Sequence, residues 1–100
     1  MLKKRVEEIL NEQLNREFYS AYLYLSMSAY FDSTDLPGFA HHMKVQYQEE
    51  MAHAIRIFNY LSNVGGRVEL KAIAQPKNVW NGIIEVFEET HKHECFITDS

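Results

Sequence analysis

Long stretches without glycine or proline dominate this chain and restrict it to helices. Only four of its 100 residues are glycine and two are proline, and residues 2–31 contain neither. These two residue types interrupt helices most often, so their scarcity favours long, uninterrupted helices. Apolar side chains in the first segment recur at helical spacing, as in Leu14, Ala21, Tyr24 and Phe31. The spacing predicts a helix over 2–31 that buries one face.

Two further helices are expected, separated from each other by one long connection. A turn rich in Asp, Ser, Thr and Pro precedes a second helix over 37–63. Gly65 and Gly66 end that helix, because glycine readily adopts the left-handed conformation of a helix C-cap. The stretch 64–81 lacks a helical pattern and is predicted to be an extended crossover, which is the connection that parallel helices need. A third helix is expected over 82–100.

These elements predict an all-α chain with a single domain over 1–100. Two long antiparallel helices form a hairpin, and the crossover leads to a third helix that the end of the chain leaves truncated. The segment from Phe18 to Phe31 is apolar on nearly every side. A helix of that kind buries more than one stripe, so contact with another subunit is expected in addition to the core.

Composition and charge exclude several classes of function. The formal net charge is −4 at pH 7, and Lys3–Arg5 is the only basic run, so nucleic acid is not expected as a partner. No apolar run approaches the roughly 18 residues of a membrane helix. The segment Val6–Gln13 is amphipathic and acidic, unlike a signal peptide. Cys95 is the single cysteine, which suits a reducing compartment. We therefore expect a cytoplasmic protein with no membrane partner.

Acidic side chains and a histidine interrupt the apolar helix faces. Glu17 does so on the first helix, Glu50 and His53 on the second, and Glu94 on the third. Burying a carboxylate without a partner costs several kcal/mol, so these positions call for a cation. Counting outward from a turn near Thr34 places Glu17 opposite the stretch between Glu50 and His53. Two carboxylates and an imidazole would then reach one ion, and Glu94 a second. A buried ion pair between His53 and a glutamate is the structural alternative.

Three segments of this sequence resemble the non-haem ferritins of bacterial and archaeal type. They are Asn11–Glu17 (NEQLNRE), Gln48–His53 (QEEMAH) and His91–Glu94 (HKHE), and the similarity extends over 2–100. Ferritin-like di-iron proteins take one glutamate from each of two helices and a Glu-x-x-His pair from each of the other two. The resemblance implies a ferritin-like helical bundle, of which this chain is a partial domain without a match to the fourth long helix.

The resemblance also implies a role for each candidate ligand. Glu17 and His53 would be terminal ligands of one iron, Glu50 would bridge to a second iron, and Glu94 would bind that second iron. The implied cofactor is a di-iron centre of Fe(II) and Fe(III). The implied reaction is a ferroxidase reaction, in which dioxygen or peroxide oxidises Fe(II) to Fe(III) before storage as ferric oxide. Carboxylates suit this reaction because hard anionic oxygens stabilise Fe(III) more than Fe(II).

Side chains beside these ligands have implied roles as well. Tyr24 resembles the tyrosine of the ferritin site, a hydrogen-bonding group and electron donor, and Glu49 would touch an accessory iron. Met51 stands where bacterioferritins have a haem-binding methionine, but haemless relatives share that residue, so haem is not expected. His91 and His93 flank the glutamate of the third helix and are expected at the surface.

The missing fourth helix shapes the expected assembly. In a three-helix chain, the apolar helix faces that a fourth helix would cover are partly exposed to solvent. Exposed apolar patches of that kind drive association. Two hairpins would together supply two glutamates and two Glu-x-x-His pairs, so a two-fold dimer would complete a four-helix bundle. A larger ferritin-like homo-oligomer is the other expected arrangement. The alternative function is a non-catalytic helical self-assembly module that has lost a complete metal site through truncation.

Overall fold

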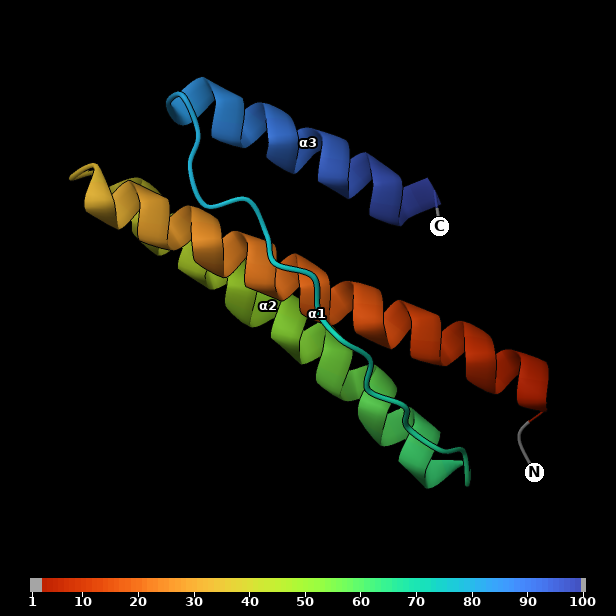
Figure 1. The fold of residues 1–100 in the computed structure, drawn as a ribbon. Coiled ribbons are helices and arrows are strands. Elements are labelled where there is room, and N and C mark those ends of the chain that lie inside the picture. The colour runs from red at the N-terminus through yellow and green to blue at the C-terminus, as the bar shows by residue number, and fades with distance from the viewer. Residues whose placement is uncertain (1–2, 100) are drawn as a thin grey trace.

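The chain forms two long helices and one shorter helix, seen in a computed structural model that describes the backbone of residues 3–99 and the side chains of residues 3–94. They are α1 (Lys4–Ser33), α2 (Pro37–Asn63) and α3 (Ile83–Asp99). Figure 1 shows α1 and α2 side by side as an antiparallel hairpin, with α3 lying beside the end where they turn. Strands are absent from the described residues, which confirms the all-α fold class. None of the described helices is both long and apolar enough to cross a membrane.

The first helix ends at Ser33, two residues beyond its expected end. It ends there because Asp35, two residues later, has a left-handed backbone conformation. Asp35 has a φ of 61°, and the N–H of Leu36 then donates to the carbonyl of Phe31 at 2.9 Å. This pattern closes a helix end, and aspartate is one of the few non-glycine residues that tolerate the conformation. The turn into α2 is therefore short. The expected termini of the outer helices, at Leu2 and Ser100, lie outside the described residues, as do the side chains of 95–100.

Two hydrophobic clusters hold the helices together. The smaller joins Leu14 of α1 to Ala54 and Leu61 of α2. The larger lies toward the α1–α2 turn and consists of Leu23, Tyr24, Met27, Phe31, Ala40, Met43, Trp80 and Val86. Full burial of a large apolar side chain stabilises a fold by roughly 1.5–3 kcal/mol. The clusters therefore fix the register of the hairpin on both sides of its middle.

The third helix lies against α1, and its side chains also reach α2, where Val86 shares the larger cluster with Ala40 and Met43. Among the described residues, α1–α2 and α1–α3 are the helix pairs whose backbones approach closely. The ring of Phe87 lies 5.7 Å from the ring of Phe39 and 6.1 Å from that of His42, measured between centroids. Ile84, on another side of α3, is 75% exposed. The position of α3 thus depends on α1 and on the segment that leads into it.

Two asparagines of α1 bind the crossover in the way that a neighbouring strand would. The side-chain amide of Asn11 donates to the carbonyl of Arg67 at 2.9 Å, and its oxygen accepts the N–H of Glu69 at 2.8 Å. Asn15 repeats the pattern one turn later, with the carbonyl of Glu69 and the N–H of Lys71, both at 2.9 Å. Four helical residues rise about 6.0 Å and two extended residues advance about 6.6 Å. The two repeats therefore stay in register.

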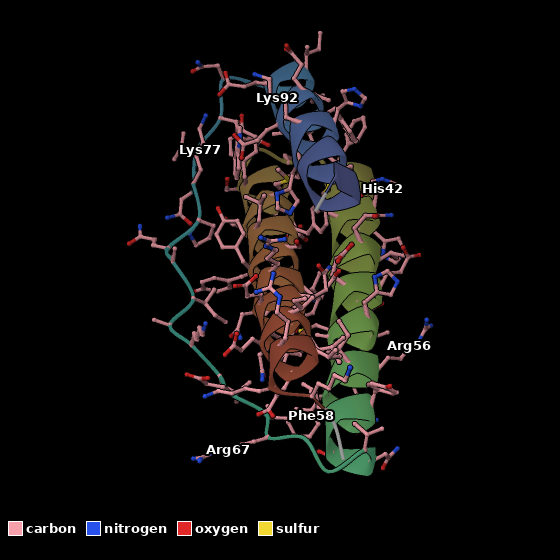
Figure 2. All side chains as sticks on the ribbon, turned by 90° about the vertical axis from the view of Figure 1, so that its right-hand side faces the viewer. His42, Arg56, Phe58, Arg67, Lys77 and Lys92 are labelled. Atoms are coloured by element: carbon pink, nitrogen blue, oxygen red, sulfur yellow. The ribbon has the colours of Figure 1, made fainter. Side chains whose placement is uncertain are left out.

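Figure 2 shows the result: the crossover runs along the side of α1 that faces away from α2, with Arg67 near its start and Lys77 near its end.

We expect Asn11→Leu to lower the free energy of unfolding by about 2 kcal/mol, because two backbone partners lose their hydrogen bonds. Urea denaturation measures this loss, and amide exchange at Glu69 should accelerate. Asn59→Leu, at an exposed position of α2, is the matched control. Equal stability of the two variants would contradict a fastening role for Asn11.

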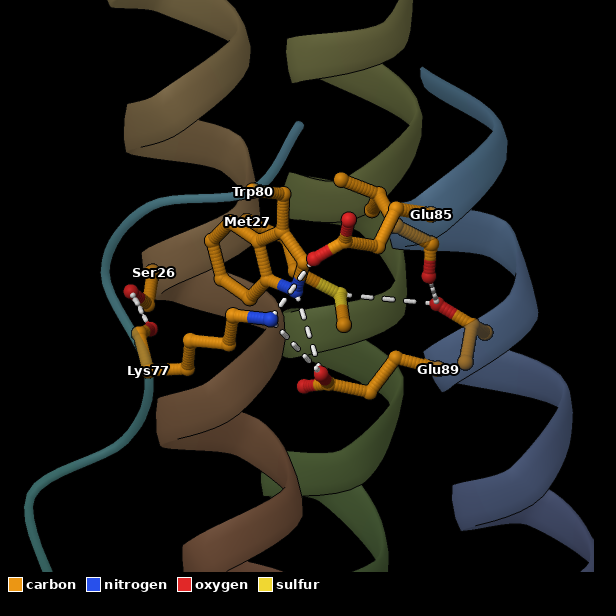
Figure 3. Close-up of polar contacts among 8 residues, drawn as sticks. Ser26, Met27, Lys77, Trp80, Glu85 and Glu89 are labelled. Atoms are coloured by element: carbon orange, nitrogen blue, oxygen red, sulfur yellow. Dashed lines mark hydrogen bonds and ion pairs between the residues drawn. The ribbon is translucent and has the colours of Figure 1, made fainter. Parts of the chain in front are cut away.

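Polar contacts also fix the far end of the crossover, just before α3 (Figure 3). The hydroxyl of Ser26 on α1 donates to the carbonyl of Lys77 at 2.6 Å. The ammonium of Lys77 donates to Glu85 at 2.7 Å and lies 5.8 Å from the centroid of the Trp80 ring. The indole N–H of Trp80 donates to Glu89 at 3.2 Å. These contacts tie the first turns of α3 to α1 and so set where the rest of α3 lies.

Candidate metal centre

Three side chains converge in the gap between the two hydrophobic clusters. They are Glu17 of α1 with Glu50 and His53 of α2, and each offers a ligand atom within 4.8 Å of the other two. The Nδ1 atom of His53 lies 3.7 Å from the Oε2 atom of Glu17 and 3.7 Å from that of Glu50. Helical spacing places Glu50 and His53 one turn apart on the same face. The antiparallel hairpin brings Glu17 opposite them.

The depth of these three side chains differs. Glu17 and Glu50 keep only 8% and 10% of their side-chain surface exposed, whereas His53 keeps 48%. A cation arriving from solvent would therefore meet the imidazole first and the carboxylates behind it. The arrangement has one open side and one closed side.

The protein leaves the two buried carboxylates short of partners. One oxygen of Glu17, Oε1, accepts a hydrogen bond from the amide of Gln13 at 2.8 Å. The Oε2 atoms of Glu17 and Glu50 are buried without any hydrogen-bond partner. Such atoms carry a desolvation penalty that a proton, a cation or a hydrogen-bond donor would relieve.

Burial and like charge make Glu50 hold its proton. Its burial, and after that the nearby carboxylate of Glu17, raise the pKa of Glu50 from 4.5 to about 8. At neutral pH the pair therefore shares a proton when no cation is present. A divalent or trivalent cation would replace that proton, since oxygen and imidazole donors suit iron, zinc and related ions. The donor set thus fits a metal ion by its chemistry.

Tyr24 and Glu94 pair with each other next to this group. Tyr24 is completely buried, and its hydroxyl donates a hydrogen bond to Oε1 of Glu94. Burial, followed by that hydrogen bond, raises the pKa of Tyr24 well above its ordinary value, so the phenol stays protonated. Glu94 is exposed and does not belong to the three-residue group, although its charge contributes to the raised pKa of Glu50.

Glu49 does not join the convergent side chains. It is exposed on α2, and its connection to the site is its charge, which also helps to raise the pKa of Glu50. Within the described residues, the structure therefore gathers Glu17, Glu50 and His53 and leaves the other sequence-predicted residues around them.

His93 is the clearest departure from the sequence expectation. Its placement at the surface was wrong, because it is half-buried against α1. Its Nε2 atom lies 2.7 Å from the hydroxyl oxygen of Ser20, and its ring meets that of Tyr24 edge-on with centroids 6.0 Å apart. Burial lowers the pKa of His93 and keeps the ring neutral at pH 7. Ser20, a polar residue on an otherwise apolar face, was the signal that something polar packs there.

Gln13 is the other functional candidate that sequence reasoning missed. It lies one helical turn before Glu17, at the spacing that brings two side chains into contact on a helix. Glutamine is common on helix surfaces, so its type alone gives no signal. Only its hydrogen bond to the Glu17 carboxylate distinguishes it.

Comparison with known proteins identifies the family. The sequence profile of the ferritin-like domain matches residues 7–100. The chain belongs to the ferritin-like family. It is 41% identical over 100 residues to a bacterial non-heme ferritin of Campylobacter jejuni, covering all of this chain and 60% of that protein. A bacterial non-heme ferritin of Bacteroides fragilis is 40% identical over 98 residues, with 98% of this chain and 62% of that protein covered.

Solved structures show the same fold. A closed form of the Archaeoglobus fulgidus ferritin, engineered by site-directed mutagenesis, superposes with a TM-score of 0.96 at 45% identity over 99% of this chain. The open-pore ferritin of that archaeon also gives a TM-score of 0.96 at 45% identity. The chain spans about 60% of the length of these relatives. The resemblance to non-haem ferritins and the ferritin-like helical fold are thereby confirmed.

Proposed function

We propose that this chain binds Fe(II) at Glu17, Glu50 and His53 and oxidises it to Fe(III) in an iron-storing ferritin assembly of the cytoplasm. One observation carries the proposal. The buried Oε2 atoms of Glu17 and Glu50 have no hydrogen-bond partner, and both lie 3.7 Å from the same imidazole nitrogen. Membership of the ferritin-like family makes iron the expected cation.

The imidazole and the two carboxylates would have different roles in binding and oxidation. Fe(II) would arrive beside the half-exposed His53 and settle against the carboxylates, displacing the proton that Glu50 holds. Each Fe(II) then gives one electron to dioxygen or peroxide, which is reduced. The anionic oxygens favour this loss because they stabilise the higher charge of Fe(III). Binding should accordingly release protons and weaken as the pH falls.

Glu50 and Glu94 would hold a second iron. Glu50 would bridge the two ions and Glu94 would bind the second, completing a di-iron centre. Tyr24 supports this placement, because its hydroxyl holds the Glu94 carboxylate on the side of α1 where α3 lies. Glu49 would contact an accessory iron from its exposed position on α2.

Self-association of the chain forms part of the proposal. Large apolar side chains are exposed on all three helices, including Tyr22 at 46%, Ile55 at 44% and Ile84 at 75%. Surfaces of this kind favour burial against a partner. Two hairpins would pair as a two-fold dimer that completes a four-helix bundle, or the chain would join a larger ferritin-like homo-oligomer. The same surfaces favour the second candidate function, a self-assembly module without catalysis.

Anaerobic loading with Fe(II) followed by native mass spectrometry tests the proposal, since it counts subunits and iron ions together. We expect a dimer or larger assembly that holds iron and that, on admission of air, forms Fe(III) faster than buffer does. The rise in near-ultraviolet absorbance measures that rate. An assembly with no bound iron and no acceleration would instead support the self-assembly module.

A further inference from the structure

The glutamate of α1 in the candidate metal centre uses its two carboxylate oxygens differently. Oε1 of Glu17 accepts the amide N–H of Gln13 at 2.8 Å. Oε2 is buried without a hydrogen-bond partner and is the oxygen that faces His53, at 3.7 Å from Nδ1. The carboxylate is therefore already oriented, with one oxygen hydrogen-bonded to the protein and the other turned toward His53 without a hydrogen bond.

We propose that Gln13 is a positioning residue that reserves Oε2 of Glu17 for the metal ion. The inference rests on the proposed function, because it describes how the same centre presents one of its ligands. Residues that hydrogen-bond to a metal ligand fix its orientation and tune its affinity for the ion. By holding Oε1, the amide limits rotation of the Glu17 carboxylate and so favours binding of the ion through Oε2 alone over binding through both oxygens.

The helix makes this hydrogen bond local. Gln13 and Glu17 are four residues apart on α1, so their side chains meet on the same face without any help from tertiary packing. Only the final orientation depends on α2, because Glu50 and His53 lie on the side to which Oε2 points. Gln13 is half-buried at the edge of the centre, where its amide is partly shielded from competing water.

The absence of charge on Gln13 matters as much as its donor. A lysine or arginine at this position would also donate to Glu17, but its positive charge would pair with the carboxylate and compete with the ion. An aspartate or glutamate would offer an acceptor where a donor is needed. Glutamine supplies a neutral donor of the right length, so the full negative charge of the site remains available to the metal.

Zinc binding to the full 100-residue chain tests the inference without redox chemistry. The donor is removed in Gln13→Met and, independently, in Gln13→Leu, both of which keep good helix formers at the position. Gln48→Met makes the same change at an exposed position of α2 and is the matched control. Calorimetry gives the affinity for Zn(II). Infrared difference spectra of zinc-loaded minus metal-free protein give the splitting of the carboxylate stretches, which reports whether one or both oxygens bind.

We expect both Gln13 variants to bind Zn(II) about 10-fold or more weakly, and their carboxylate splitting to shift toward that of a glutamate bound through both oxygens. Gln48→Met should match the unsubstituted protein. Unchanged affinity and splitting in the Gln13 variants would overturn the inference while leaving the proposed metal centre intact. Failure of the unsubstituted protein to bind Zn(II) would overturn the proposed centre itself, and the inference with it.

Discussion

Replacing His53 with alanine is expected to weaken Fe(II) binding by about 100-fold or more, because loss of a direct ligand exceeds the roughly 10–100-fold effect of losing an outer partner. His53 supplies the one nitrogen donor of the three-residue group and stands at its exposed side. Glu17 and Glu50 would remain and would still repel each other. The imidazole that a cation from solvent meets first would be absent. Oxidation of Fe(II) under air should slow in proportion.

Anaerobic titration with Fe(II) measures the affinity, and the rate of Fe(III) formation after admission of air measures the oxidation. His41→Ala is the matched control, since His41 is an exposed histidine in the first turns of the same helix. Circular dichroism should show the same helix content in all three proteins. Equal Fe(II) affinity in His53→Ala and His41→Ala would remove His53 from the proposed ligand set.

Without metal, the free energy of unfolding should fall as the pH rises from 4.5 to about 8, the ordinary and the folded-state pKa values of Glu50. In this window the unfolded chain has released the Glu50 proton while the folded chain still holds it. The folded state therefore binds more protons, and a rise in pH favours unfolding by at most about 1.4 kcal/mol per pH unit. The stabilising contribution is complete below 4.5 and is lost as the pH passes through about 8.

Urea denaturation at a series of pH values in the presence of a chelator measures this slope. Glu50→Gln should flatten it and stabilise the metal-free protein above neutral pH, because the amide needs no proton. Saturating Zn(II) should reverse the slope, since the metal binds the deprotonated carboxylate. A metal-free protein whose stability stays constant across the window would show that burial does not hold the Glu50 proton.

The helices and the pairing of the central acids were predictable from local pattern. Helical periodicity and the scarcity of glycine and proline act within a few turns, so they located the long hairpin without tertiary information. Once the hairpin is assumed, counting from its turn brings Glu17 opposite Glu50 and His53. The structure places one ligand atom of each of these residues within 4.8 Å of the other two. The late end of α1 escaped prediction because it depends on the left-handed backbone of Asp35.

Contacts made by α3 and the crossover could not be read from the chain. Asn11 and Asn15 bond to backbone groups more than 50 residues away, and such bonds leave no periodic trace in a sequence. His93 is half-buried because the crossover contacts around Lys77 and Trp80 set the position of α3, so its environment exists only after the chain has folded.

The sequence by itself therefore determined which residues are the candidate metal ligands of this ferritin-like chain, because residue type and helical spacing are local properties. Tertiary structure alone decided the burial, the hydrogen-bond partners and the pKa values of those residues. It buried two carboxylates between two hydrophobic clusters, left the Oε2 atoms of Glu17 and Glu50 without partners, and raised the pKa of Glu50 to about 8. Desolvation and like charge act through space, and only the packed hairpin brings those carboxylates close enough for either to operate.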